Sequence, residues 1–165
     1  ETAPIQRNNR VFKKVFFRYH DHKQITKEGN DYNFDAEVAF FAHGKIYVLS
    51  KNRSNTYTKL YRLDTTNHFE VTTLTLLDTF DSKGKVTGAD ISKDGKTLAV
   101  LTYTGVWLFK AKNKDDYFDG DIWWLPINAK GMEGICFDDE NTLILSREPT
   151  GTLHELKIAD LKKVR

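Results

Sequence analysis

Two stretches of the sequence place a carboxylate and a cation at the same separation around an apolar run. AEVAFFAHGKIYVLSK contains Glu37 and Lys51, and MEGICFDDENTLILSR contains Glu133 and Arg147. If each stretch is a β-hairpin, the start of its first strand lies beside the end of its second strand. Opposite charges placed in this way stabilise a hairpin by about 0.2–1 kcal/mol. The spacing therefore predicts two ion pairs, Glu37 with Lys51 and Glu133 with Arg147.

Further charged and phenolic residues near the same hairpin ends extend this pattern to a candidate rim site. The expected ligand-binding residues are Glu37, Lys51, Arg53, Asp90, Tyr103, Glu133, Arg147 and Glu148. Carboxylates are ligands that Ca²⁺ prefers, and Asp35, Glu37 and Glu133 are the metal candidates. Arginines bind anions well, so a small anionic ligand is an alternative occupant. A third interpretation is that the pairs only set the strand register, because ion-pair networks need not be functional.

An internal repeat relates these two hairpins to a third one. With the second strands aligned at Ser50, Thr102 and Ser146, the first strands align Glu37, Ala89 and Glu133. Ala89 interrupts the series of glutamates, and the neighbouring Asp90 is the expected substitute. A fixed spacing that recurs three times indicates a repeat architecture.

The elements that carry these residues are short strands. Runs rich in β-branched and aromatic residues alternate with turns rich in Gly, Asn, Asp and Lys, which is typical of a mainly antiparallel β protein. Four antiparallel strands per repeat describe the blades of a β-propeller. A β-sandwich is the alternative, although it requires no repeat. We predict one all-β partial propeller domain over 1–165, with four-stranded blades at about 36–80, 86–127 and 131–165, the last without its outermost strand.

About three blades are too few to close a ring, because propellers usually have four to eight. The chain could be half of a six-bladed ring whose N-terminal half is missing from this sequence. Alternatively, a second copy or another chain could supply the remaining blades. Residues 10–19 have the pattern of an outer strand from a preceding blade, which favours the first explanation. The sequence begins ETAPIQ, which indicates a removed leader or a piece of a longer chain.

The composition excludes several classes of protein. Apolar residues make up 39% and charged residues 29% of the 165 residues, as in globular domains. No apolar run approaches the roughly 20 residues of a membrane-spanning helix. The 25 basic and 23 acidic residues are interspersed, so a nucleic-acid partner is not expected. The single cysteine, Cys136, cannot form an internal disulfide and is expected to be a buried small hydrophobe.

Several stretches resemble the repeated pattern of secreted bacterial six-bladed β-propellers that are grouped near the esterase-like phytase propellers. They are FRYHD (17–21), FDAEVAFF (34–41), YVLSKNR (47–53), VTGADISKDGKTLAVLTY (86–103) and GMEGICFDDENTLILSRE (131–148). The similarity covers roughly residues 10–158, and TGADIS and EGI…SRE are its most specific parts. Members of this family are larger, with additional blades before the FRYHD-like strand. The resemblance implies a secreted, periplasmic or cell-surface protein, generally without a demonstrated reaction.

The leading functional hypothesis is an extracytoplasmic binding or scaffold module with a charged rim at the central channel and no assigned catalytic residue. The alternative follows from the resemblance, because phytase-like relatives use Ca²⁺ and channel carboxylates against phosphate esters. In that case Glu37 and Glu133 would match the recurring glutamates, and the protein would be a Ca²⁺-assisted phosphoesterase. Calcium is accordingly the one cofactor that the sequence suggests.

Overall fold

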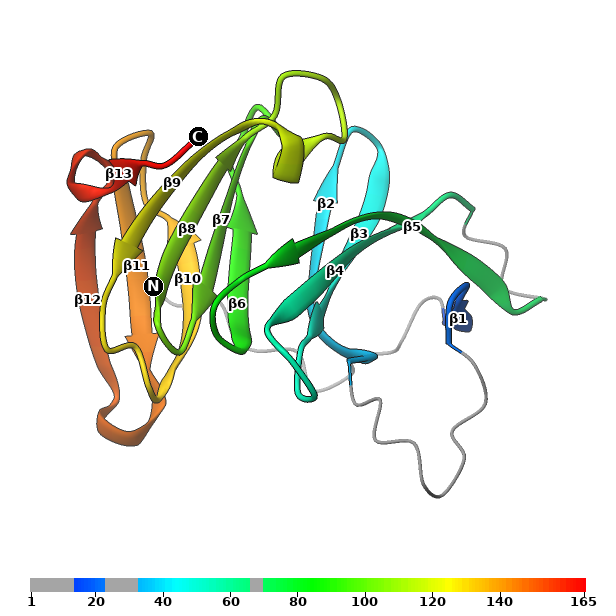
Figure 1. The fold of residues 1–165 in the computed structure, drawn as a ribbon, viewed down its shortest axis with the longest axis horizontal. Coiled ribbons are helices and arrows are strands. Elements are labelled where there is room, and N and C mark those ends of the chain that lie inside the picture. The colour runs from blue at the N-terminus through cyan, green and yellow to red at the C-terminus, as the bar shows by residue number, and fades with distance from the viewer. Residues whose placement is uncertain (1–13, 23–32, 66–69) are drawn as a thin grey trace, which may run out of the picture.

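A computed structural model describes residues 14–22, 33–65 and 70–165 of the chain. In this part of the chain the regular elements are β-strands, apart from three short 3-10 helices. The predicted all-β class is confirmed. Figure 1 shows the strands grouped into sheets that follow one another along the long axis of the molecule.

The first sheet has five strands in the order β1-β5-β4-β3-β2. The four consecutive antiparallel strands are β2 (Asp35–Ala42), β3 (Lys45–Lys51), β4 (Tyr57–Leu63) and β5 (Thr72–Asp81). Along β2 the buried Val38, Phe40 and Ala42 alternate with exposed residues. This alternation gives the strand one apolar face, because successive side chains point to opposite sides of a sheet.

The fifth strand of this sheet is β1 (Phe17–Tyr19), which pairs parallel with β5 at the outer edge. Residues 17–19 therefore belong to the first sheet, whereas residues 10–19 were expected to form an outer strand of a preceding blade. Residues 10–13 of that expected strand lie outside the described residues.

The second sheet also has five strands. Its consecutive antiparallel strands are β6 (Val86–Ile91), β7 (Thr97–Thr102), β8 (Gly105–Lys110) and β9 (Asp121–Pro126). The last strand, β13 (Lys162–Lys163), pairs antiparallel with β9. The end of the chain thus returns to the second sheet, although the sequence repeat assigns it to the third unit.

The third sheet has three antiparallel strands, β10 (Met132–Phe137), β11 (Thr142–Arg147) and β12 (Thr152–Lys157). One face of this sheet packs on the second sheet, where Ile135 and Leu145 join a core with Leu101 and Leu108. Cys136 points to the opposite face and is exposed, so its expected burial is wrong. The reason is strand alternation, because Ile135 occupies the core-facing position next to it.

The first strands of the three sheets are neighbours. In Figure 1 β6 stands between β2 and β10, and it contacts both. At Gly88 of β6 an added Cβ would lie 3.3 Å from the Glu133 carbonyl oxygen of β10, so the two backbones approach closely. This order brings the starts of three hairpins, far apart in sequence, to one region of the surface. No helix in the described ranges is long and apolar enough to cross a membrane.

Candidate functional site

A β-bulge interrupts the first strand of each sheet near its start. The register shifts lie between Ala36 and Val38, between Val86 and Gly88, and between Met132 and Gly134. The extra residues are Glu37, Thr87 and Glu133. A bulge adds one residue to a strand and changes the direction of its side chain. The side chains of these three residues therefore do not follow the regular up-and-down alternation of their strands.

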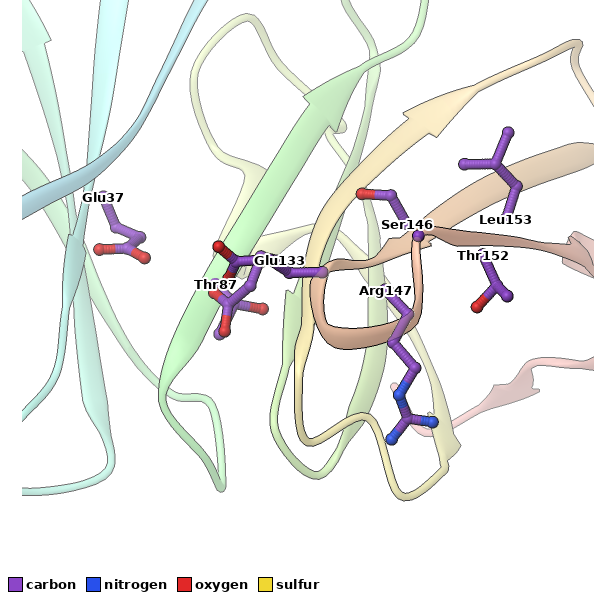
Figure 2. A pocket seen from close by; sticks show the side chains of 9 residues that line it. Glu37, Thr87, Glu133, Ser146, Arg147, Thr152 and Leu153 are labelled. Carbon is purple, nitrogen blue, oxygen red and sulfur yellow. The ribbon is translucent and has the colours of Figure 1, made fainter.

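The three bulge residues line one cavity of about 650 Å³, to which we refer as the rim cavity. Figure 2 shows Glu37, Thr87 and Glu133 on neighbouring strands. The remaining lining residues are Ser146, Arg147, Glu148, Gly151, Thr152 and Leu153. A cavity of this volume lies in the range of small-molecule sites. The expected convergence of Glu37 and Glu133 on one site is thus seen in the geometry.

The middle position of the series is Thr87, and neither Ala89 nor Asp90 occupies it. Ala36 pairs with Ser50, 14 positions later, whereas Val86 pairs with Thr102, 16 positions later. Because the second hairpin is two residues longer, counting back a fixed number of positions reaches Ala89 instead of Thr87. The sequence therefore gives no direct signal for Thr87, which only the strand register reveals.

Asp90 has a different role from the expected one. Its carboxylate accepts a hydrogen bond from the backbone N–H of Phe137, at 2.8 Å. This contact ties β6 to β10 three residues beyond Thr87, about 10 Å along the strand. Asp90 is not among the residues that line the rim cavity.

The predicted ion pair between Glu37 and Lys51 is confirmed. The Lys51 ammonium donates to Glu37 Oε1 at 2.6 Å, and the two side chains are 8% and 19% exposed. Tyr103 lies beside this pair, with its ring centroid 5.9 Å from Lys51 Nζ, within the range of a cation–π contact. Lys51 is therefore held by a carboxylate and an aromatic face, and of these three residues Glu37 is the one that lines the rim cavity.

Arg53 forms a second ion pair in the same hairpin. Its guanidinium donates to Asp35 Oδ2 through both Nε and Nη2. This hydrogen bond raises the pKa of Arg53 above its ordinary value, although desolvation opposes the shift. Both side chains are well exposed, so the pair stabilises the fold by no more than about 1 kcal/mol. Neither residue lines the rim cavity.

The predicted ion pair between Glu133 and Arg147 is wrong. Arg147 donates to the Lys130 carbonyl oxygen at 2.8 Å, and Figure 2 shows its side chain directed away from Glu133 and Thr87. Within the described ranges, the Glu133 carboxylate has no ion pair or hydrogen bond. Glu133 thus enters the cavity as an uncompensated carboxylate.

The register of the third hairpin explains this difference. Arg147 stands opposite Met132, the residue just before the bulge, as Ser50 stands opposite Ala36. The position that corresponds to Lys51 is therefore that of Glu148, the next residue. Where the first hairpin has the cation Lys51, the third hairpin thus has a second carboxylate, Glu148.

Thr87 contributes a buried hydroxyl. The residue is 4% exposed, and its Oγ1 has no hydrogen-bond partner in the described part of the chain. An unpaired buried hydroxyl costs about 1–3 kcal/mol. Such groups are rare in folded proteins, and a bound ligand or an ordered water is their usual partner.

Ser146 offers a further hydroxyl to the cavity. A Cβ at Gly134, which faces Ser146 across the hairpin, would lie 2.5 Å from Ser146 Oγ. Gly134 therefore provides the space that this hydroxyl occupies. Like Thr87, Ser146 was not expected at the site from the sequence.

The carboxylates of the described residues do not form a metal-ligand cluster. No group of three or more His, Cys, Asp or Glu residues is placed to hold a metal ion in the ranges that the structure describes. Of the expected metal candidates, Asp35 and Glu37 are each engaged by a cation, and Glu133 stands alone. The geometry therefore offers separate carboxylates and hydroxyls to a ligand.

A comparison with models of known protein families finds no match for this chain. A comparison with curated proteins finds no significant match either.

Proposed function

We propose that the chain forms consecutive blades of an extracytoplasmic, six-bladed β-propeller and acts as a binding module through the rim cavity. The observation that carries this proposal is the meeting of Glu37, Thr87 and Glu133, from three successive sheets, at one cavity. Clefts built by repeated elements commonly carry binding groups, because each repeat contributes a side chain from an equivalent position.

The order of the strands supports the propeller part of the proposal. In each sheet the strands follow the chain order from β2, β6 or β10 outward, apart from the added β1 and β13. The three first strands are neighbours, as expected for strands that line a central channel. Two sheets packed face to face, the alternative architecture, would not place three first strands side by side.

An exposed apolar side chain on the first sheet supports a closed ring. Phe41 on β2 is large and exposed, on the face of its strand opposite to the buried Phe40. Apolar surface of this kind is commonly covered by a partner. The missing blades would come from a preceding part of a longer chain, a second copy or another chain. The secreted, periplasmic or cell-surface location belongs to the same proposal and rests on the family resemblance.

A ligand screen by thermal unfolding tests the binding role. The 165-residue protein is heated with small amines, sugars, carboxylates and phosphate, because a bound ligand raises the unfolding temperature. We expect at least one compound to stabilise the parent protein and to lose its effect in Thr87→Val and Glu133→Gln. The matched controls are Thr79→Val and Glu140→Gln, whose exposed parent residues lie outside the cavity. Absence of stabilisation by every compound would overturn the binding role.

The same protein also tests the phosphoesterase alternative. A phosphate monoester is incubated with the protein and Ca²⁺, and Ca²⁺ binding is measured by calorimetry. The binding proposal predicts no turnover. Turnover that requires Ca²⁺ and disappears in Glu133→Gln would replace the binding module by an enzyme.

A further inference from the structure

The free charge in the rim cavity is negative. Lys51 is occupied by Glu37, and Arg147 is bonded to the Lys130 carbonyl oxygen and directed away from the cavity centre. Glu133 and Glu148 have no ion pair among the described residues. An anionic ligand would have to turn Arg147 back toward the cavity centre or displace Glu37 from Lys51 to gain a cation, whereas a cationic ligand meets unpaired carboxylates directly.

The uncharged part of the lining points to hydroxyl groups on the ligand. Thr87 lines the cavity, and its buried hydroxyl has no partner in the described ranges. This observation is independent of the carboxylates, because a lone acidic pair could simply be solvated. A ligand hydroxyl that bonds to Thr87 would remove the cost of an unsatisfied buried group. Ser146 supplies a second hydroxyl on the neighbouring sheet.

The residues that line the rim cavity limit the kind of ligand that fits. None of the described residues that line the cavity is aromatic, so a flat aromatic ligand has no stacking partner among them. The apolar part of the wall is Leu153, and Gly151 leaves open space beside it. A compact, largely polar molecule matches this lining better than a hydrophobic one.

We propose that the ligand of the rim cavity is a small hydroxylated amine that binds as a cation. Its ammonium group donates charge-assisted hydrogen bonds to Glu133, with Glu148 as a second source of negative charge. Its hydroxyl groups bond to Thr87 and Ser146. This inference rests on the proposed binding role and specifies the ligand class for the same site.

A matched set of three sugars tests the ligand class. D-glucosamine, D-glucose and D-glucuronate share one ring and differ in charge, and each is titrated into the 165-residue protein by NMR at mildly acidic pH, where the amine is protonated. We expect glucosamine to bind at least about tenfold more tightly than glucose, because hydrogen bonds to charged groups are the stronger class. Glu133→Gln should remove most of this preference. Thr87→Val should weaken the binding of glucosamine and glucose alike.

The outcomes separate this inference from the proposed function. Preference for glucuronate, or equal binding of all three sugars that Thr87→Val weakens, would overturn the cationic class and leave the binding role in place. Binding of glucosamine that is unchanged in both variants would place the amine elsewhere and also overturn the inference. Glu140→Gln serves as the charge control, because this exposed residue lies outside the cavity and its loss should not alter the preference.

Discussion

Lys51 and Glu37 form a 2.6 Å ion pair across the first hairpin, and the lysine side chain is almost fully buried. A buried charge is strongly destabilising when its partner is removed, because no water replaces the lost contact. The pair therefore stabilises the hairpin that carries Glu37 into the rim cavity, and it keeps Lys51 from serving an anionic ligand. The stability contribution of the pair can be measured separately from its effect on ligand binding.

Truncation of Lys51 should destabilise the protein more than truncation of an exposed lysine. We expect Lys51→Ala to lower the free energy of unfolding by about 2–3 kcal/mol, because Glu37 is left partly buried without a cation. Lys157→Ala is the control, since its pair with Glu155 is exposed and should contribute little to stability. Urea denaturation measures both values. Equal losses in the two variants would contradict a structural role for the Glu37 pair.

The double variant Lys51→Met with Glu37→Leu distinguishes the pair from the packing of its side chains. Replacement of both charges by apolar groups of similar volume is often nearly neutral. We expect the double variant to recover most of the stability that Lys51→Ala loses. If it is as unstable as Lys51→Ala, packing by the lysine stem is the dominant contribution.

Removal of the Thr87 hydroxyl should not destabilise the ligand-free protein. Thr87→Val keeps the shape of the side chain and removes an unpaired buried group, so we expect the free energy of unfolding to stay equal or to rise by about 1 kcal/mol. Thr102→Val is the matched control, because the buried Thr102 hydroxyl donates to the Gly105 carbonyl oxygen at 3.0 Å. That variant should lose about 1 kcal/mol. A loss in Thr87→Val as large as in Thr102→Val would show that Thr87 has a structural partner.

The sequence predicts the parts of this site that depend on local pairing. The pair of Glu37 and Lys51 is predicted by a hairpin with a two-residue turn, in which Ala42 pairs with Lys45, and the bulge at Glu37 still leaves that residue within reach of Lys51. Thr87 and the direction of Arg147 do not follow from the spacing. Both depend on the position of a bulge and on hairpin length, and neither leaves a distinct pattern of residue types.

The same distinction applies to the fold. Period-two alternation and turn residues are sufficient to predict strands and the all-β class. The parallel pairing of β1 with β5 and the return of β13 to β9 involve residues far apart in the chain. Tertiary packing determines such pairings, and the repeat in the sequence does not predict them. For this reason the sequence pattern predicts neither the place of β1 in the first sheet nor that of β13 in the second sheet.

Gly134 should be required for the local packing around Ser146. A methyl group at this position would lie 2.5 Å from Ser146 Oγ, well inside contact distance. We expect Gly134→Ala to lower the free energy of unfolding by about 1–3 kcal/mol through overpacking. In a Ser146→Ala background the loss should shrink, because the Ser146 Cβ would lie 3.7 Å from the added methyl group. Additive losses in a double-mutant cycle would contradict a direct clash.

Asp21 should make the stability of the first sheet dependent on pH in the acid range. Burial alone would raise the pKa of Asp21, but hydrogen bonds from Lys59 at 2.7 Å and Tyr61 at 2.9 Å prevail and lower it below the ordinary value of 3.8. A carboxyl whose pKa is lower in the folded protein stabilises it above the unfolded pKa, and this contribution is lost as pH falls through the folded pKa. Urea denaturation from neutral pH to below the ordinary pKa should therefore show a smaller acid-induced loss in Asp21→Asn than in the parent protein. An identical pH dependence of the two proteins would contradict this role, and Asp78→Asn, at a partly exposed β5 position that forms no ion pair among the described residues, provides the matched control.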